Sequence, residues 1–473
     1  MKPIIANQAG TAAASSKSAP SVRWTLASLA LSMLLSSLGT SIANVGLPTL
    51  ARAFEAPFQQ VQWVVLAYLL TVTSLVVGAG RLGDLVGRRR LMLGGISVFT
   101  AGSAMCALAP SLALLIAARA IQGAGAAVMM ALTMAFVAGA VPKEKTGGAM
   151  GLLGTMSAVG TALGPTLGGA LIAWFGWPAL FQVCVPLGAL ALVLAYRFLP
   201  ADGPRTGRPE FDHAGTLLLA LTLAAYALAM TVGHGGFGAI NAGLLGAALC
   251  GAGLFMRAEA KSASPLIPLA MFRDPVLKAG FAMSALATTV VMATLVVGPF
   301  YLSGALALDA ARVGLVMSTG PIVAALAGVP AGWLVDRFGA GRAAIAGLMA
   351  MATGAALLAT IAAAHGVAGY IAPLAVVTAG YALLQAANNT AVMADVLPER
   401  RGVVSGLLNL SRNLGLVTGA SVMGAVYALG SADGVAVTVA AAAGMRLTFG
   451  IATALILAAL AIASIRRGHV LLV

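Results

Sequence analysis

Long apolar runs alternate with short polar segments along almost the whole chain of 473 residues. Each run is close to the ~20 apolar residues that a helix needs to cross a bilayer. Strands are not indicated, because the alternating ten-residue pattern of membrane barrels is absent and lipid admits only helices or closed barrels. The pattern predicts fourteen transmembrane helices, at roughly 24–47, 61–80, 91–109, 112–139, 147–173, 177–198, 214–232, 237–256, 276–303, 313–335, 342–363, 367–394, 402–429 and 447–465.

Composition supports a polytopic membrane protein, since 60% of the residues are hydrophobic and only 8% are charged. A soluble domain carries roughly 25% charged residues, so soluble enzymes and nucleic-acid binders are excluded. Cys106, Cys184 and Cys250 fall in separate apolar runs without metal-ligand spacing. We therefore expect no metal site, no disulfide framework and no nucleic-acid partner.

The net charge of +14 reflects basic loops, which set the orientation of membrane helices. With the amino terminus in the cytoplasm, Arg52, Arg312 and Arg446 lie outside, and Arg119 and Arg412 lie within spans. The other 22 of the 27 Lys and Arg residues then face the cytoplasm. This bias predicts an inner (plasma) membrane protein with both termini cytoplasmic.

Two segments recur along the chain at a nearly constant offset. Gly80, Asp84 and Gly87 correspond to Gly332, Asp336 and Gly339 at an offset of 252, and Gly151, Gly160 and Gly164 correspond to Gly406, Gly415 and Gly419 at 255. A parallel duplication of this kind is a transporter plan, with the site near the midplane between the halves. It predicts a six-helix bundle at 23–199, two inserted helices at 200–262 and a second bundle at 263–473. Residues 1–22 are rich in Ala and Ser and are predicted to be a disordered tail. The first apolar run is too long for the core of a cleaved signal and stays as the first span.

The duplicated loop is the most specific motif in the sequence. Its glycines permit a tight turn between two spans, and its acid can cap a helix or pair with arginine. Plain orientation charge would need neither the fixed spacing nor a second copy, so we expect a gating role. The residues concerned are Gly80, Gly83, Asp84, Gly87, Arg88, Arg89, Gly332, Asp336, Arg337 and Gly339.

This Gly-x-Leu-x-Asp-x-x-Gly-Arg-Arg loop is similar to the signature loop of the major facilitator superfamily. Fourteen spans with a central pair resemble its fourteen-span drug:proton antiporter branch. The resemblance implies an all-α major facilitator fold with two six-helix bundles plus two inserted helices. It also implies a transporter rather than an enzyme, needing no cofactor beyond a proton gradient.

Further motifs share the resemblance. Arg119 and Gln122 look like the family's Arg-x-x-Gln-Gly motif, whose arginine is implicated in proton coupling, and a charge within a span normally faces a cavity or a partner. An arginine satisfied by neighbouring carbonyls is the alternative. Gly160, Gly164, Pro165, Gly168 and Gly169 look like the antiporter motif of exporters, although such spacing alone most often means helix packing.

Polar side chains form stripes on three other predicted helices. Helical spacing groups Ser37, Thr40, Ser41 and Asn44; Gln385, Asn388 and Asn389; and Asn409, Arg412 and Asn413. Interhelical hydrogen bonding accounts for many such amides, whereas Arg412 carries more weight as a cavity residue because it is charged. The first stripe departs from the branch's motif, which has an aspartate where this chain has Gly39, and Cys184 stands where the family usually has asparagine.

No Asp or Glu falls clearly inside a predicted span, so neutral or anionic cargo is favoured over cations. We expect a monomer that exports small, moderately apolar molecules by alternating access in exchange for protons. An importer or uniporter of an anionic metabolite and a non-transporting receptor on the same scaffold remain alternatives. A membrane-embedded enzyme is disfavoured, because no catalytic cluster lies within the spans.

Overall fold

The computed structural model describes residues 19–140, 146–202, 213–232, 238–261, 274–361, 365–394, 396, 401–431 and 436–470, and helices make up nearly all of this part of the chain. Thirteen described helical segments are long and apolar enough to cross a membrane. The remaining expected span is α6, in which the apolar stretch among the described residues is Val159–Phe175. The predicted fold class is confirmed.

The first half of the chain forms one bundle, in which α1 packs on α6 and α8, and α5 packs on α3 and α4. Two expected spans are each split into a short and a long helix, namely α2 with α3 and α7 with α8. The helices are α1 (Ala19–Ala53), α2 (Phe58–Val61), α3 (Trp63–Val86), α4 (Arg88–Ala107), α5 (Leu112–Ala140), α6 (Thr146–Phe175), α7 (Ala179–Gln182) and α8 (Cys184–Phe198).

The second half repeats this plan, with α11 packed on α16 and α18, and α15 packed on α13 and α14. A π-helical turn, η4, interrupts the span formed by α16 and α17. The helices are α11 (Pro275–Gly304), α12 (Ala310–Met317), α13 (Thr319–Phe338), α14 (Ala340–Thr360), α15 (Gly366–Met393), α16 (Arg401–Thr418), η4 (Gly419–Met423), α17 (Gly424–Gly430) and α18 (Val437–Val470).

The inserted pair, α9 (His213–Thr231) and α10 (Ala239–Lys261), lies beside both halves through α9. Trp63 Nε1 in α3 donates a hydrogen bond to Thr231 Oγ1 at 3.1 Å. Tyr226 Oη donates to Thr418 Oγ1 of α16 at 3.2 Å. The insert is therefore bonded to one helix of each bundle.

Glycines make matching helix contacts in the two halves, as the duplication requires. Small residues let helix backbones approach closely. Gly125 of α5 lies against Gly95 and Phe99 of α4, and Gly380 of α15 lies against Gly347 and Met351 of α14. These residues are related by the offsets of 252 and 255 seen in the sequence. The same register aligns Gly160 and Gly164 of α6, which pack on α1, with Gly415 and Gly419 of α16, which pack on α11.

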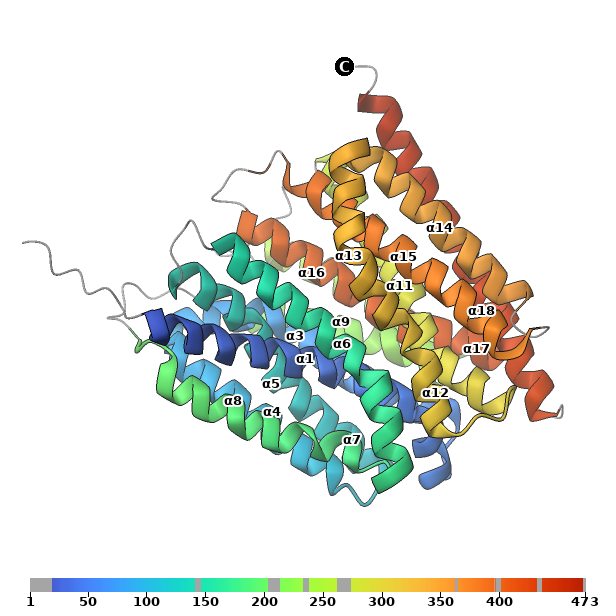
Figure 1. The fold of residues 1–473 in the computed structure, drawn as a ribbon, viewed down its shortest axis with the longest axis horizontal. Coiled ribbons are helices and arrows are strands. Elements are labelled where there is room, and N and C mark those ends of the chain that lie inside the picture. The colour runs from blue at the N-terminus through green and yellow to red at the C-terminus, as the bar shows by residue number, and fades with distance from the viewer. Residues whose placement is uncertain are drawn as a thin grey trace, which may run out of the picture.

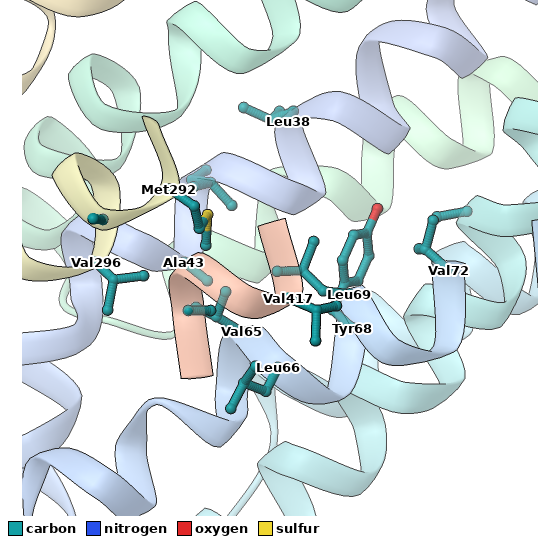
Figure 2. Close-up of a cluster of buried hydrophobic side chains, with 14 of the residues drawn as sticks. Leu38, Ala43, Val65, Leu66, Tyr68, Leu69, Val72, Met292, Val296 and Val417 are labelled. Carbon is teal, nitrogen blue, oxygen red and sulfur yellow. The ribbon is translucent and has the colours of Figure 1, made fainter. Parts of the chain in front are cut away.

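The halves converge at one end of the molecule and diverge towards the other (Figure 1). They meet through an apolar cluster, to which α1 and α3 contribute Leu38, Val65 and Leu69 (Figure 2). Met292 of α11 and Val417 of α16 complete it from the other half.

Two further crossings lie at the same end. Gly169 of α6 packs on Gly314 of α12, whose Cα is 2.8 Å from an ideal Cβ at Gly169. Gln62, at the start of α3, packs on Gly424, with its Oε1 2.6 Å from an ideal Cβ there. Gly169 and Gly424 are related by the offset of 255, and Gln62 and Gly314 by 252, so the two crossings are equivalent positions in the repeat.

Among the starts of the helices, those of α1 and α18 differ most from the expected ones. Helix α1 begins at Ala19, so the last four residues of the expected tail are helical. Helix α18 begins at Val437, ten residues before the expected span, and carries Arg446 on its exposed side. Arg446 was expected in a loop, and its long side chain allows the charged end to reach the membrane surface from within a span.

Candidate transport site

Arg119 is enclosed in the first bundle, with no exposed surface. Its Nε donates a hydrogen bond to the Val64 carbonyl at 2.8 Å, and a terminal nitrogen donates to the Gly39 carbonyl at 2.9 Å. The other terminal nitrogen donates to Gln122 Oε1. The guanidinium carbon also lies 4.3 Å from the centre of the Tyr68 ring. One side chain of α5 thus joins α1 and α3.

The network continues into α4. Gln122 Nε2 donates to Ser103 Oγ at 2.7 Å, and Ser103 Oγ donates to the Phe99 carbonyl. A charge at the centre of a membrane helix costs ~2.5–3.5 kcal/mol on insertion scales. The carbonyls and the ring of Tyr68 offset that cost at Arg119 without a carboxylate. The expectation of a cavity-facing arginine is wrong for this conformation, and its role in proton coupling stays a prediction.

The polar stripe of α1 faces α6 rather than open space. Ser37 Oγ and Ser157 Oγ are hydrogen-bonded at 2.7 Å, and Ser41 Oγ donates to the Gly160 carbonyl at 3.3 Å. Methyl groups at Gly160 and Gly164 would overlap α1. The hydroxyls and glycines are therefore one packing surface, in which Thr40 alone of the stripe's candidate residues is half-buried.

Asn44 lies one turn beyond Thr40 and is buried. Its Nδ2 donates to the Thr40 carbonyl at 3.2 Å, while its Oδ1 makes no hydrogen bond with any described residue. On the other face of α6, Pro165 and Gly169 contact Gly314 of α12. The glycine-rich motif therefore serves both the packing within its bundle and one crossing between the halves.

The duplicated loop forms the same turn twice. Gly87 separates α3 from α4 with φ +107°, and Gly339 separates α13 from α14 with φ +82°. Glycine tolerates such positive φ values without steric cost. Gly80 and Gly332 instead lie within helices, with open space where a Cβ would be, so the turns do not require them. Gly83 lies against Leu132 of α5.

Asp202, a residue that the sequence did not single out, supplies the carboxylate at the first turn. Its Oδ1 accepts a hydrogen bond from the Arg89 backbone N–H at 2.8 Å, and its Oδ2 accepts from Arg90 N–H at 3.3 Å. This satisfies orphan donors at the start of α4. The Arg89 side chain also donates to the Tyr196 carbonyl of α8, which ties α4 to α8.

The two loops carry one acid each, Asp84 in the first and Asp336 in the second. The backbone of Asp84 belongs to α3, but its side chain lies outside the described residues. Asp336 is exposed, and Arg337 beside it stacks 5.1 Å from the Trp333 ring centre. The gating role of both acids stays a prediction, as does that of the exposed Arg88.

The amides of α15 do not share one environment. Asn388 is buried and its Nδ2 donates to the Gly280 carbonyl of α11 at 2.9 Å. Asn389 is exposed and Gln385 is half-buried. The predicted polar face therefore runs from a buried edge at Asn388 to an exposed edge at Asn389, because consecutive residues of a helix point about 100° apart. Asn388 fits the interhelical hydrogen bonding that was the alternative to a cavity role.

Arg412 of α16 contrasts with Arg119. It is half-buried and makes no hydrogen bond, ion pair or ring contact with any described residue, and its Nε is enclosed without a partner. Asn413 is 8% exposed, and its Nδ2 is likewise enclosed and unpaired. Asn409, one turn earlier, is half-buried.

The contacts of α16 show which way this group faces. Ser411 and Gly415 face α11, because Ser411 Oγ donates to the Phe281 carbonyl and Gly415 packs on Ala285. Thr418 faces α9, and Val417 lies with α3 in the apolar cluster (Figure 2). At about 100° per residue, Arg412 and Asn409 occupy the remaining side of the helix, between its α11 and α3 sides, and Asn413 lies at its α3 edge.

The model of the Major Facilitator Superfamily matches residues 29–420. The chain belongs to the major facilitator superfamily. It is therefore a multi-pass membrane transporter, and the expectation that it is not an enzyme is confirmed by its family.

Several relatives of this major facilitator protein match over most of their length. It is 32% identical to the uncharacterized transporter YebQ of Escherichia coli over 89% of this chain and 94% of that protein. It is 31% identical to the riboflavin transporter RibZ of Clostridioides difficile, over 85% and 87%. It is 33% identical to the multidrug resistance protein Stp of Mycobacterium tuberculosis, over 85% and 75%.

Solved structures agree with the fold. A bacterial homologue of the human lysosomal transporter Spinster, in an inward-facing and occupied conformation, superposes with a TM-score of 0.69. The match covers 95% of this chain and 97% of that one at 15% sequence identity. At that identity the likeness concerns the major facilitator fold alone.

Proposed function

We propose that this chain exports small, moderately apolar molecules by alternating access, in exchange for protons. The observation that carries the proposal is the meeting of the halves at one end, where both pseudo-equivalent crossings lie. On the orientation predicted from the basic loops, that end is outside, so this conformation opens towards the cytoplasm. Cargo would enter from the cytoplasm. It would leave on the outside after the bundles rock, so that the contacts at the outer end open and the cytoplasmic end closes.

Two observations support export as the direction. Stp, one of the relatives, is named for multidrug resistance. The glycine-proline motif, which resembles that of exporters, lies in α6 at a crossing between the halves, where Pro165 and Gly169 contact Gly314. A change in this contact would accompany any change of access.

In this proposal, the group that takes up the proton does not lie at the centre of the molecule. Glu259 is the buried acid among the described membrane helices, and it lies near the end of α10, which packs on α9. A carboxylate at the cytoplasmic mouth, with Asp84 the first candidate, or the cargo itself would take the proton. Arg119 would respond to that protonation through its contacts without titrating, since arginine stays charged.

Uptake of a metabolite is the second candidate, and one observation favours it. RibZ, of which this chain covers 87%, is named as a riboflavin transporter. An importer or uniporter would share the fold and the crossings described above. It would differ in the direction of net cargo movement and in its response to the proton gradient.

Flux into inverted membrane vesicles separates these functions. Export predicts that a labelled cargo accumulates inside energised inverted vesicles, releases protons from them, and stops accumulating when an uncoupler is added. Accumulation with no proton movement and no sensitivity to the uncoupler would contradict proton exchange. Absence of flux for every compound in a broad drug and metabolite panel would favour a receptor on this scaffold.

The proposed setting is the plasma (inner) membrane, with a monomer whose two termini are cytoplasmic. The orientation follows from the basic loops. Reporter fusions after Pro110 should read as outside, and fusions after Lys261 should read as cytoplasmic. The opposite readings would invert the conformation assigned here and make the closed end cytoplasmic.

A further inference from the structure

We propose that Arg412, with Asn409 and Asn413, binds the anionic head of an amphipathic cargo. The inference rests on the proposed transport function and names the class of cargo. It begins from the unpaired state of the three side chains, whose five possible guanidinium donors and two amide groups bond to no described residue. An intramembrane cation without a partner is costly, and a ligand acceptor is the partner that a transporter would supply.

The position of the group suits a site between the halves. It occupies the side of α16 left free by the contacts to α11 and α9, as the hydrogen bonds of Ser411 and Thr418 show. Val417, one turn beyond Asn413, belongs to the apolar cluster that joins the halves (Figure 2). The group therefore lies next to the closed contact, on the side where the bundles diverge.

The chemistry of the group selects the ligand. A guanidinium and amide N–H groups donate hydrogen bonds, and arginine matches a carboxylate in a two-pronged arrangement. The buried acid of the described spans, Glu259, belongs to α10 rather than to either bundle. Val417 lies one turn beyond Asn413 and shares the apolar cluster with Leu69 of α3 (Figure 2), so the rest of the cargo would lie against apolar side chains. An apolar body with one acidic head fits both features.

The repeat gives an independent reason to treat Arg412 as specific to this site. The offset of 255 aligns Arg412 with Ser157 of α6, which is hydrogen-bonded to Ser37 of α1. Packing at this register therefore needs only a small hydroxyl in the first half. Arg412 makes no such interhelical bond, so packing does not account for its charge.

Binding to the purified protein in nanodiscs tests the assignment without relying on flux. Three probes share a pyrene body and differ in the head group: pyrenebutyrate, pyrenebutanol and pyrenebutylamine. We expect the Kd of the carboxylate to be roughly tenfold lower than that of the alcohol, because one charge-assisted hydrogen bond changes affinity by about this factor. Arg412→Gln should remove this ratio and leave alcohol binding unchanged. Arg257→Gln, which removes an exposed arginine from α10, is the matched control and should keep the ratio.

A second variant covers the case in which Arg412→Gln does not fold. Asn413→Asp places a carboxylate beside Arg412, and we expect it to abolish the preference for pyrenebutyrate and favour the amine. Equal affinities of acid and alcohol for the unaltered protein would overturn the proposal, as would an unchanged ratio in either variant.

Lipid head groups are the other source of an anion. Nanodiscs of phosphatidylcholine alone are compared with nanodiscs that also contain phosphatidylglycerol. Unchanged pyrenebutyrate affinity supports a cargo site, and loss of that affinity in phosphatidylglycerol assigns the site to lipid and overturns the proposal. Binding without flux would refute export but keep the site, whereas flux without acid preference would refute the site and keep export.

Discussion

The two halves of the chain share a plan but place their charges differently. Arg119 is fully enclosed in the first half, where it donates to Gly39 and Val64. The offset of 255 aligns Arg119 with Leu374 and Gln122 with Val377, both buried. The second half thus builds the same helix contact from apolar side chains, so the bundle fold does not require a buried charge at this position.

The second half carries its arginine on α16 instead, where Arg412 has no partner among the described residues. Each of the three guanidinium nitrogens of the enclosed Arg119 donates a hydrogen bond, and these bonds join helices. A half-buried and unpaired guanidinium is instead available to a ligand. The role of an arginine within a span therefore depends on the groups that it contacts rather than on its depth in the membrane. We infer that Arg119 holds the first bundle together, and the proposal above gives Arg412 a binding role.

The largest expected effect is on Arg119. Arg119→Ala should lower stability by roughly 3 kcal/mol or more, because it leaves Gln122 and buried carbonyls without donors, and it should abolish flux. Arg412→Ala should leave the thermal midpoint unchanged and alter which cargo is accepted. Thermal unfolding in detergent, with flux measured in parallel, checks both results.

A double variant gives the first half the apolar residues that the second half has at the equivalent positions. The double variant Arg119→Leu, Gln122→Val removes the network as a unit, and replacing a buried polar group by apolar partners is often tolerated. We expect it to regain much of the stability lost in Arg119→Ala while flux stays absent. Full flux in the double variant would show that the buried arginine has no part in transport.

Sequence predicted the fold because the signals for it are local. Apolar runs, basic loops and the two offsets each lie within short windows, so the halves and the insert could be placed without contacts. The start of α18 was missed because the segment 437–446 is rich in alanine and contains Gly444 and Arg446, which weakens its apolar character.

The site was harder to predict, because its features depend on distant residues. Asp202 caps α4 from more than a hundred residues away, so no local spacing pointed to it. Arg119 and Arg412 look alike in sequence, each an arginine in an apolar run. Their repeat partners, Leu374 and Ser157, were the available signal that the two positions differ.

The second expected effect concerns the duplicated loops. Asp84→Asn should reduce flux severely with normal membrane insertion, whereas Asp336→Asn should be milder. The reason is that Ala340 and Gly341 stand where the first copy has Arg88 and Arg89, so the second acid has fewer cations to exchange with. Initial rates of flux in vesicles with matched protein content measure the difference. Unaltered flux in both variants would show that these acids have no gating role and serve only to orient the helices in the membrane.

The crossings between the halves should respond less strongly. Gly169→Ala adds a methyl group against the backbone of Gly314, whereas Gly424→Ala meets the flexible Gln62 side chain. We expect Gly169→Ala to lower the population of the conformation that is closed at this end more than Gly424→Ala does. Distances between spin labels placed across that end would report the shift. Equal shifts would show that the two crossings are mechanically alike.

The smallest effect is expected from restoring the branch's acid. The branch's motif has an aspartate where this chain has Gly39, and a carboxylate within a span would attract cationic cargo. The structure places an ideal Cβ at Gly39 only 3.0 Å from Tyr68 Oη, and the Gly39 carbonyl on Arg119. The new carboxylate would pair with Arg119, so we expect little change in cargo range. A broad gain of cationic cargo in susceptibility and flux assays would contradict this location.

The division of tasks between the two arginines is tested most directly by the thermal shift that pyrenebutyrate produces in each variant. A ligand that binds the folded protein raises its midpoint. We predict that Arg412→Gln keeps the midpoint of the unliganded protein and loses the shift. Arg119→Lys should lower the unliganded midpoint, because lysine lacks the planar fork that reaches three partners, yet keep the shift. A retained shift in Arg412→Gln, together with a lost shift in Arg119→Lys, would contradict the account.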